Sequence, residues 1–468
     1  MNGNAPRSAP PAVTFFGGTI GAVLPLVVFL TGVAWLGLSG APDERGFWPV
    51  LVVSLGAGTL LATDRAAYGD AVVRGMAQPL VMIMVLAWLL AGILGSLMNA
   101  SGFVDALVEA ATRIGLTGGG FVAMAFLVCA LVSTATGTSL GTLIICMPLL
   151  YPPVRAVGAD PAMAVGAMLS GATFGDNISP VSDTTIASAH TQGADLGGVV
   201  RSRLRYALPA AAVALAVFSV AGSGAEPTPT GTPAGGSGLV PLVMMAVPVL
   251  VVWLLIAGRS LLVGLLAGIG AGCVVALGFG LIEPSALLWI DREAYRARGI
   301  VVEGMQRGVG VSIFTILLMG IVGGVEAGGV VDRVLEAVRR RARSARGAEA
   351  WIVGAVTAAV FVTTHSVVAI LTVGRFARDT GAACGVSPYR RANLLDMTVC
   401  TYPFLFPFFV PTILAASLTA SGASLGAPHL TPWSAGLHNI HSWALLGMVV
   451  VAVWGGYGRR APVELSDR

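Results

Sequence analysis

Carboxylate, amide and hydroxyl side chains gather in residues 170–190, which read SGATFGDNISPVSDTTIASAH and follow an apolar run. Asp176, Asn177, Ser179, Asp183 and Thr184 lie within this stretch. Oxygen ligands of this kind bind a hard cation such as sodium, whereas the free amides at a helix N-terminus favour an anion. The residue types therefore predict an ion site.

The same stretch interrupts a helix. Residues 161–175 are expected to form a helix too short to cross about 30 Å of hydrocarbon. We expect a break from Gly175 to Ser179, with Ser179 capping and Pro180 opening a second half-helix. A break of this kind is tolerated in a membrane only beside a cavity or inside the protein. Because Asp176 and Asp183 would be costly in lipid, a functional role is favoured over a purely structural pair.

Composition indicates the environment of this site. The 468 residues are 56% hydrophobic and only 11% charged, so the fold class is predicted to be an all-α polytopic membrane protein. The predicted crossings lie near 20–38, 47–63, 78–98, 204–222, 239–257, 261–282, 309–325, 398–418 and 440–456. The first apolar run is too long for the core of a signal peptide, so we expect the N-terminus to be retained. The arginines are too dispersed to indicate nucleic acid, and the five scattered cysteines do not suggest a disulfide framework or a zinc site.

Two halves of the chain resemble each other. LAGILGSLMNASGFVDALVEA (90–110) aligns with LMGIVGGVEAGGVVDRVLEA (318–337), and VSTATGTSLGT (132–142) meets VTTHSVVAILT (362–372) at an offset of 230. The hydroxyl-bearing stretches interrupt apolar segments whose arms are each about half a membrane long, which predicts two re-entrant hairpins with tips at 133–139 and 363–366. The predicted organisation is an N-terminal tail (1–19), a first repeat (20–222), a linker (223–238), a second repeat (239–457) and a C-terminal tail (458–468).

Arginine positions indicate the topology. With the hairpins counted as non-crossing, each half has five crossings. Because this number is odd, the second half must start on the opposite side of the membrane and is inverted relative to the first. We expect discontinuous transmembrane helices in both halves. Placing both termini in the cytoplasm puts twenty arginines inside and seven outside, as the positive-inside tendency favours. The predicted location is a bacterial-type cytoplasmic membrane. The sequence leaves the oligomeric state open, a homodimer included.

Residues 171–185 (GATFGDNISPVSDTT), preceded by STATGTSLGT, strongly resemble the NhaC-type sodium/proton antiporter family of the ion transporter superfamily. The resemblance implies a secondary transporter that couples sodium and proton movement, with exchange of small carboxylates or amino acids in some members. By the same resemblance, the ion and substrate site consists of a hairpin tip and the broken helix: Thr136, Gly137, Thr138, Ser139, Asp176, Asn177, Ser179, Asp183 and Thr184. Asp176 and Asn177 are the expected sodium ligands.

The second half departs from the family pattern, since NLLDMTVCTYPFLFPFF (393–409) keeps Asp396 and Pro403 but ends in phenylalanines. A counterpart site is expected from Thr363, Thr364, His365, Ser366, Asn393, Asp396 and Thr398. His365 could carry the coupled proton or be a neutral residue fixed by one hydrogen bond, with Asp176 and Asp183 as competitors. Histidines 190, 429, 438 and 441 are interpreted as loop or boundary residues.

The sequence thus predicts sodium/proton antiport by alternating access, with lipid, sodium and protons as partners and no cofactor. The alternative within transport is a sodium- or proton-coupled carrier or exchanger of a small organic acid or amino acid. An intramembrane hydrolase that uses Ser366 with His365 is disfavoured, because no nucleophile elbow or HExxH helix is found. A channel is disfavoured by the paired broken segments. Stoichiometry, transport direction and the identity of an organic substrate are left open.

Overall fold

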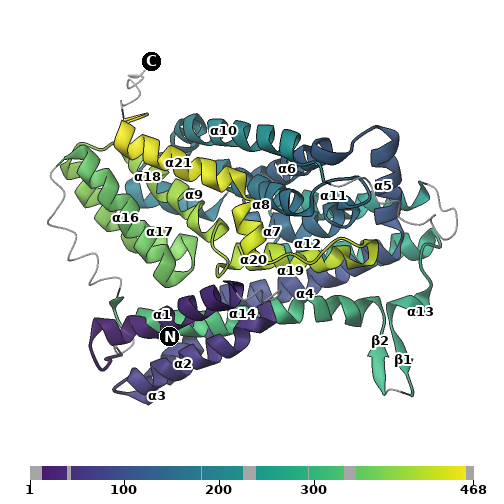
Figure 1. Cartoon of the computed structure of the whole chain (residues 1–468), viewed down its shortest axis with the longest axis horizontal. Helices are drawn as coiled ribbons and strands as arrows, with labels where there is room; N and C mark the ends of the chain where they lie inside the picture. Colours follow the sequence, from purple (N-terminus) through teal and green to yellow (C-terminus); the bar gives the residue numbers. More distant parts are fainter. Residues whose placement is uncertain are drawn as a thin grey trace, which may run out of the picture.

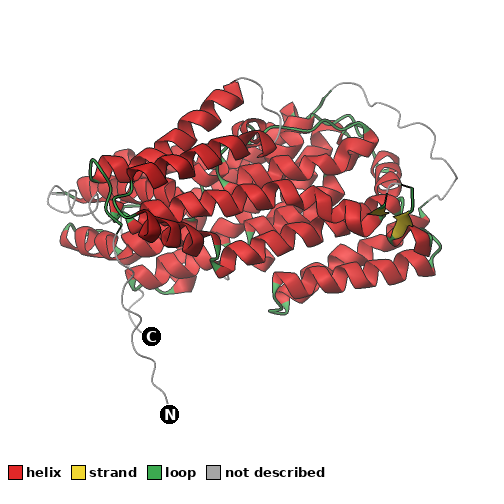
Figure 2. Cartoon of the chain, turned by 90° about the horizontal axis from the view of Figure 1, so that it is seen from below, coloured by secondary structure: helices red, strands yellow, loops and turns green. Residues whose placement is uncertain are grey.

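The computed structural model describes residues 13–38, 44–180, 182–224, 239–293, 295–330 and 344–459. Within these ranges the chain is nearly all helical, with one short antiparallel hairpin (Figure 2). The arginines at 333, 339, 340, 341 and 343, residues 225–238 of the predicted linker, and residues 1–12 and 460–468 of the predicted tails lie outside the described residues.

The first half is a series of helices of unequal length. In order they are α1 (Thr19–Leu38), η1 (Glu44–Phe47), α2 (Trp48–Leu61), α3 (Arg65–Met76), α4 (Pro79–Ala100), α5 (Phe103–Arg113), α6 (Gly118–Thr136), α7 (Ser139–Leu150), η2 (Pro152–Val154), α8 (Pro161–Ile178), α9 (Asp183–Gln192) and α10 (Leu196–Ala221).

The remainder of the chain likewise consists of helices of unequal length, with one short hairpin. Its elements are η3 (Val240–Met245), α11 (Ala246–Ile256), α12 (Leu261–Gly278), α13 (Pro284–Leu287), β1 (Trp289–Asp291), β2 (Arg296–Arg298), α14 (Ile300–Ala327), α16 (Ala345–Thr363), α17 (Ser366–Ala383), α18 (Pro388–Val399), η4 (Tyr402–Phe404), α19 (Val410–Leu418), η5 (Thr419–Leu425), α20 (Pro432–Leu437) and α21 (Ile440–Gly455). Gly92 and Gly95 lie on α4, and the glycines aligned with them, Gly320 and Gly323, lie on α14.

Six helices among the described residues are long and apolar enough to cross a membrane: Val81–Ala100, Gly118–Thr136, Leu196–Ala221, Leu261–Gly278, Ile300–Ala327 and Ala345–Thr363. Six shorter apolar helices accompany them. This pattern confirms the coarse prediction of a helical polytopic membrane protein. The spans differ in how much of them is buried within the protein. In α14, 72% of the apolar segment is buried, whereas in α12 only 28% is buried. Helix α14 is therefore central, and α12 presents most of its surface to the surroundings.

The helices form two groups (Figure 1). In one group α14 packs against α2, α3 and α4, while α12 packs against α4 and α11. In the other, α8 packs against α6, α7, α10 and α21, and α18 packs against α9, α16 and α17. Contacts of α7 with α4 and of α19 with α14 join the groups. The candidate site lies at this junction.

Glycines let the helices approach closely within each group. A Cβ atom on Gly304 of α14 would lie 2.6 Å from the Cα of Ile93 on α4. A Cβ atom on Gly171 of α8 would lie 2.2 Å from the carbonyl oxygen of Phe126 on α6. Small residues at such contacts are typical of helix packing in membranes, where close backbone approach supplies the packing energy.

Two predicted segments differ in the structure. The predicted crossing at 398–418 is interrupted, because α18 ends at Val399 and α19 begins only at Val410. Three prolines at 403, 407 and 411 lie in or beside this gap, and proline cannot donate the amide hydrogen bond that a continuous helix needs. The arm before the first predicted hairpin tip is also longer than half a membrane, since α6 has 19 residues.

We expect Gly171→Ala to lower the unfolding free energy by about 1–3 kcal/mol, because the new methyl group would push α8 away from α6. Thermal unfolding of the purified protein in detergent would measure this loss. Gly270→Ala on α12 is the matched control, since a Cβ atom there meets nothing within 4 Å. Equal stability of the two variants would contradict close packing of α6 and α8.

Candidate functional site

The helix pairs α6–α7 and α16–α17 are interrupted in the same way. Gly137 ends α6 with φ 68°, and Thr364 ends α16 with φ 51°, so both interruptions turn through a left-handed residue. The next residue caps the following helix in each case: the Thr138 hydroxyl accepts from the Gly141 amide, and the His365 ring accepts from the Val368 amide. The interruptions lie within the predicted tips, but they correspond at an offset of 227 rather than 230.

The third interruption separates α8 from α9, and its position corrects the prediction. Helix α8 continues through Asp176 and Asn177 to Ile178, and α9 begins at Asp183 rather than at Pro180. The residue before a proline is driven out of the helical region, and Ser179 accordingly has ψ 130°. Proline therefore ends the first helix instead of opening the second.

Asp176 joins three helices through its carboxylate. Its Oδ1 accepts a hydrogen bond from the Ser182 hydroxyl at 2.6 Å, just before α9. Its Oδ2 accepts from the backbone amide of Ser139, the first residue of α7, at 3.3 Å. The predicted meeting of the hairpin tip with the broken helix is thus present as a direct contact. Among the described residues, Asp176 forms no ion pair.

A cavity of about 260 Å³ opens beside this contact, between the two helix groups. It is lined by nine of the predicted residues, Gly137, Thr138, Ser139, Asp176, Asp183, Thr184, Thr364, His365 and Ser366. Trp88 and Met84 of α4 and Thr315 of α14 line it from the other group. Residues from the α6–α7, α8–α9 and α16–α17 interruptions therefore all line this one cavity.

The remaining predicted residues, Thr136, Asn177, Ser179, Thr363, Asn393, Asp396 and Thr398, do not line this cavity. The Thr136 and Thr398 hydroxyls donate to carbonyls of their own helices, at Val132 and Leu394. The Ser179 hydroxyl donates to the Thr134 carbonyl at 2.8 Å and ties the end of α8 to α6. These hydroxyls already have backbone partners.

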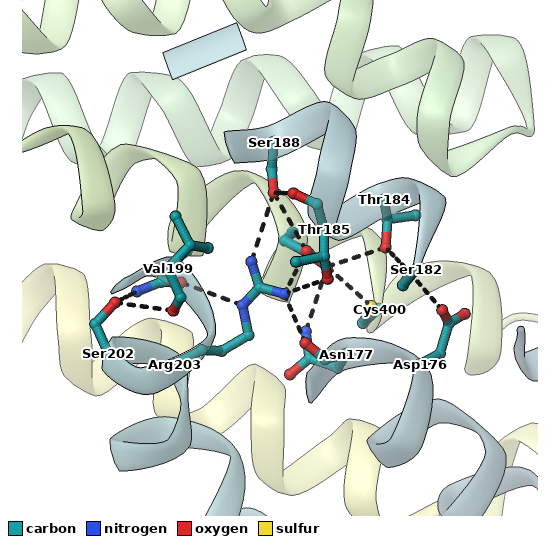
Figure 3. A network of polar contacts seen from close by, with 12 residues as sticks. Asp176, Asn177, Ser182, Thr184, Thr185, Ser188, Val199, Ser202, Arg203 and Cys400 are labelled. Carbon is teal, nitrogen blue, oxygen red and sulfur yellow. Dashed lines mark hydrogen bonds and ion pairs between the residues drawn. The ribbon is translucent and has the colours of Figure 1, made fainter. Parts of the chain in front are cut away.

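Asp396 does not line the cavity, and it forms a buried ion pair that the sequence analysis did not predict. Its Oδ2 is 2.5 Å from Nη1 of Arg203, and both side chains are fully buried. The hydroxyls of Thr184 and Ser188 also donate to this carboxylate, each at 3.3 Å. Figure 3 shows the Arg203 guanidinium at the centre of the network. Arg203 is one of the twenty arginines that the predicted topology places on the cytoplasmic side, but its side chain is buried inside the protein.

The spacing of the arginines on α10 indicates that Arg203 points in a different direction from its two neighbouring arginines. Residues two apart on a helix point to nearly opposite faces, and α10 contains the pattern RSRLR at 201–205. Arg201 and Arg205 share one face, and Arg201 is exposed. Arg203 must then point the other way, into the protein.

Asn177 and Asn393 belong to the network around Arg203. The Asn177 amide nitrogen donates to Asp396 Oδ1 at 3.3 Å, and its backbone carbonyl accepts from Arg203 at 2.6 Å. Asn393 accepts from Arg203 Nε at 3.1 Å and donates to Ser202 at 2.8 Å. Asn177 is thus directed toward Asp396, so the two expected sodium ligands, Asp176 and Asn177, face different surroundings.

The histidines fall into distinct environments. His365 lines the cavity, and its Nδ1 accepts from the Val368 amide at 3.5 Å, a role that requires this nitrogen to be unprotonated. His441 was interpreted as a boundary residue, but it is fully buried on α21 and packs edge-on against Phe174 at 5.3 Å between ring centroids. His441 therefore belongs to the packed interior.

The described residues contain no group of three or more histidine, cysteine or acidic side chains that could hold a metal ion. Sodium needs no such group, because hydroxyl and carbonyl oxygens serve it as ligands. All five cysteines are free, and Cys129, Cys146 and Cys400 are buried.

Comparison of the amino-acid sequence with known proteins identifies relatives of this chain. Residues 6–223 match the model of the Na+/H+ antiporter family. The chain is 28% identical over 318 residues to the Na(+)/H(+) antiporter NhaC of Alkalihalophilus pseudofirmus, covering 63% of this chain and 67% of that protein. It is 33% identical over 102 residues to the Malate-2H(+)/Na(+)-lactate antiporter of Bacillus subtilis, covering 22% of each.

We expect Asp396→Asn to lower the unfolding free energy by about 3–5 kcal/mol, because the buried Arg203 would lose its counter-charge. Removing both charges in Asp396→Asn/Arg203→Met should recover a large part of this loss, since no uncompensated charge is left. Thermal unfolding of both variants in detergent measures the two effects. A double variant less stable than Asp396→Asn alone would contradict the charge-pairing explanation.

Proposed function

We propose that the chain exchanges sodium for protons across the membrane at Asp176, and the match of residues 6–223 to the Na+/H+ antiporter family supports this proposal. The name of the NhaC relative supports this activity. The family is one of transporters, so we do not expect an enzymatic reaction, and the cargo ions are the only ligands that the proposal requires.

The observation that carries the proposal is the environment of Asp176. The carboxylate ends a broken helix, lines the cavity and has no ion-pair partner among the described residues. Three residues that carry hydroxyl groups, Thr138, Ser139 and Thr184, line the same cavity. A carboxylate with neighbouring hydroxyls can hold either a proton or a sodium ion, and an acid at this depth is a functional residue by default.

Exchange follows from competition for one carboxylate. Sodium coordinates the deprotonated acid, so a bound proton excludes it and a bound sodium ion excludes the proton. If the loaded site faces each side of the membrane in turn, each ion must be displaced before the other is carried back. Asp183 is exposed at the cavity and adds a second negative charge that attracts cations to it.

We propose alternating access by two inverted halves, 20–222 and 239–457, in a cytoplasmic membrane with both termini in the cytoplasm. The matched geometry of the α6–α7 and α16–α17 interruptions supports this arrangement. In it α6–α7 and α16–α17 are re-entrant pairs whose first helices, with 19 residues each, run through most of the membrane before they turn back at the cavity.

Asp176→Asn should abolish sodium-driven proton movement in proteoliposomes, with a loss of sodium affinity of at least about tenfold, or about 1.4 kcal/mol. A pH-sensitive dye enclosed in the vesicles would follow the exchange. Asp70→Asn on α3 is the control, because this carboxylate is exposed and remote from the cavity lining. Normal exchange in Asp176→Asn would remove Asp176 from the ion pathway.

Sodium affinity should rise as the pH rises, because the competing proton leaves the carboxylate. We expect Asp176→Asn and Asp183→Asn each to abolish this dependence, whereas His365→Gln only shifts its midpoint. The Nδ1 hydrogen bond of His365 supports the smaller role. Sodium titrations at several pH values measure the effect. Loss of pH dependence in His365→Gln alone would assign the proton to the histidine.

The topology predicts opposite accessibility for two exposed helix N-caps, Thr117 before α6 and Ser344 before α16. In a background without the native cysteines, an impermeant thiol reagent added to intact cells should label Thr117→Cys but not Ser344→Cys. Ser344→Cys should react only in inverted vesicles. Labelling of both from one side would contradict inverted halves.

A coupled carrier of a small organic acid or amino acid is the second candidate. The cavity volume of about 260 Å³ exceeds the need of a sodium ion, and apolar side chains such as Trp88 and Phe404 line it. The name of the malate and lactate antiporter supports this reading. Proteoliposomes distinguish the two: a sodium/proton antiporter moves protons with sodium alone, whereas a carrier requires added malate, lactate or an amino acid.

A further inference from the structure

Arg203 is surrounded by oxygen atoms from several elements (Figure 3). Its Nη1 is 2.5 Å from Asp396 Oδ2, 2.6 Å from the carbonyl oxygen of Asn177 and 2.8 Å from the Thr185 hydroxyl. Its Nη2 is 3.5 Å from the Ser188 hydroxyl. The Arg203 side chain is fully buried.

These oxygens are of the types that bind a hard metal cation. They comprise a carboxylate, a main-chain carbonyl and two hydroxyls. The Asn177 carbonyl is free to take part because α8 ends one residue later, and the last carbonyls of a helix have no partner within it. The guanidinium therefore occupies the position that a bound cation would take.

Asp176 and Asp396 hold comparable places in the two halves. Each lies in the last turn of a helix that is then interrupted, α8 after Ile178 and α18 after Val399. Their charge environments differ. Asp176 faces the cavity and receives hydrogen bonds only from neutral groups, Ser182 and the Ser139 amide. Asp396 is outside the cavity lining and is paired with a cation.

We propose that Arg203 is a tethered cation that permanently fills the cation site of Asp396, so that only Asp176 exchanges ions and each chain binds one sodium ion. Arginine is never deprotonated in proteins, and covalent attachment holds it in place. The Asp396 site is consequently filled whether the cavity holds sodium or a proton. This inference rests on the proposed sodium binding at Asp176.

The inference predicts that removing Arg203 creates a new sodium site. A buried carboxylate without a counter-charge is strongly unfavourable, so Asp396 should recruit a cation from solution when the guanidinium is gone. Sodium can use the same carboxylate, carbonyl and hydroxyl oxygens.

Equilibrium binding of radioactive sodium to purified protein tests this directly, with thermal unfolding at increasing sodium concentration as a second readout. Wild type should bind one sodium ion per chain, and Asp176→Asn should bind none. Asp176→Asn/Arg203→Gln should regain one ion per chain and a sodium-dependent rise in Tm. Adding Asp396→Asn to this double variant should abolish both the regained sodium binding and the sodium-dependent rise in Tm.

Two controls separate charge from general disturbance of α10. Arg203→Lys keeps a cation, so in the Asp176→Asn background it should bind no sodium. Arg201→Gln removes an exposed arginine of the same helix and should leave wild-type binding unchanged.

The outcomes distinguish the inference from the function on which it rests. If wild type binds one ion that Asp176→Asn loses, but the Arg203→Gln double variant binds none although folded, the tethered-cation role is wrong and Asp176 keeps its role. If wild type binds two ions per chain, the role is overturned without any Arg203 variant. If wild type binds no sodium, or Asp176→Asn binds as wild type does, the proposed sodium site itself fails.

Discussion

The interruption between α8 and α9 imposes the constraint on which the site depends. Pro180 forces Ser179 out of the helix, and the carbonyls at the end of α8 then need partners inside an apolar protein. Arg203 of α10 supplies one partner by donating to the Asn177 carbonyl. Each carbonyl left unpaired in hydrocarbon would cost several kcal/mol, which is comparable to the net free energy of unfolding of a whole domain. The break therefore requires α10 and its buried cation to lie against it.

The buried cation in turn separates the two carboxylates. Arg203 needs a negative partner and takes Asp396, because removing one member of a buried pair leaves an uncompensated charge. Asp176 is left with hydroxyl and amide donors and with the cavity. Two acids at comparable places in the halves thus acquire different roles. Asp396 ties α18 to α10 through its ion pair, and Asp176 faces the cavity, where we propose that it binds an ion.

Close packing within each helix group makes the cavity between the groups possible. Glycines bring α14 against α4 and α8 against α6, so each group is compact by itself. The surface between the groups is lined by interrupted helices on one side and by Trp88, Met84 and Thr315 on the other. Interrupted helices cannot pack as evenly as continuous ones, because their turns and caps point side chains and backbone amides into the gap. The space that results has polar groups at the interruptions and apolar walls elsewhere.

The sequence by itself determined the helical membrane class and the interruptions near 137, 179 and 364, and it singled out Asp176 as the candidate ion ligand. Each of these depends on local properties: long apolar runs, a proline after a serine, and polar residues within apolar segments. The sequence did not place the break accurately, because Gly175 permits a helix and the backbone continued to Ile178. Only the tertiary structure decided which acid is paired. The contact between Arg203 and Asp396 spans 193 positions of the chain (396 − 203), and no local pattern predicts which buried charges meet across such a separation. The counter-charge of a carboxylate depends on helix packing, so the fold decides that Asp396 is paired with a cation and that Asp176 faces the cavity without one among the described residues.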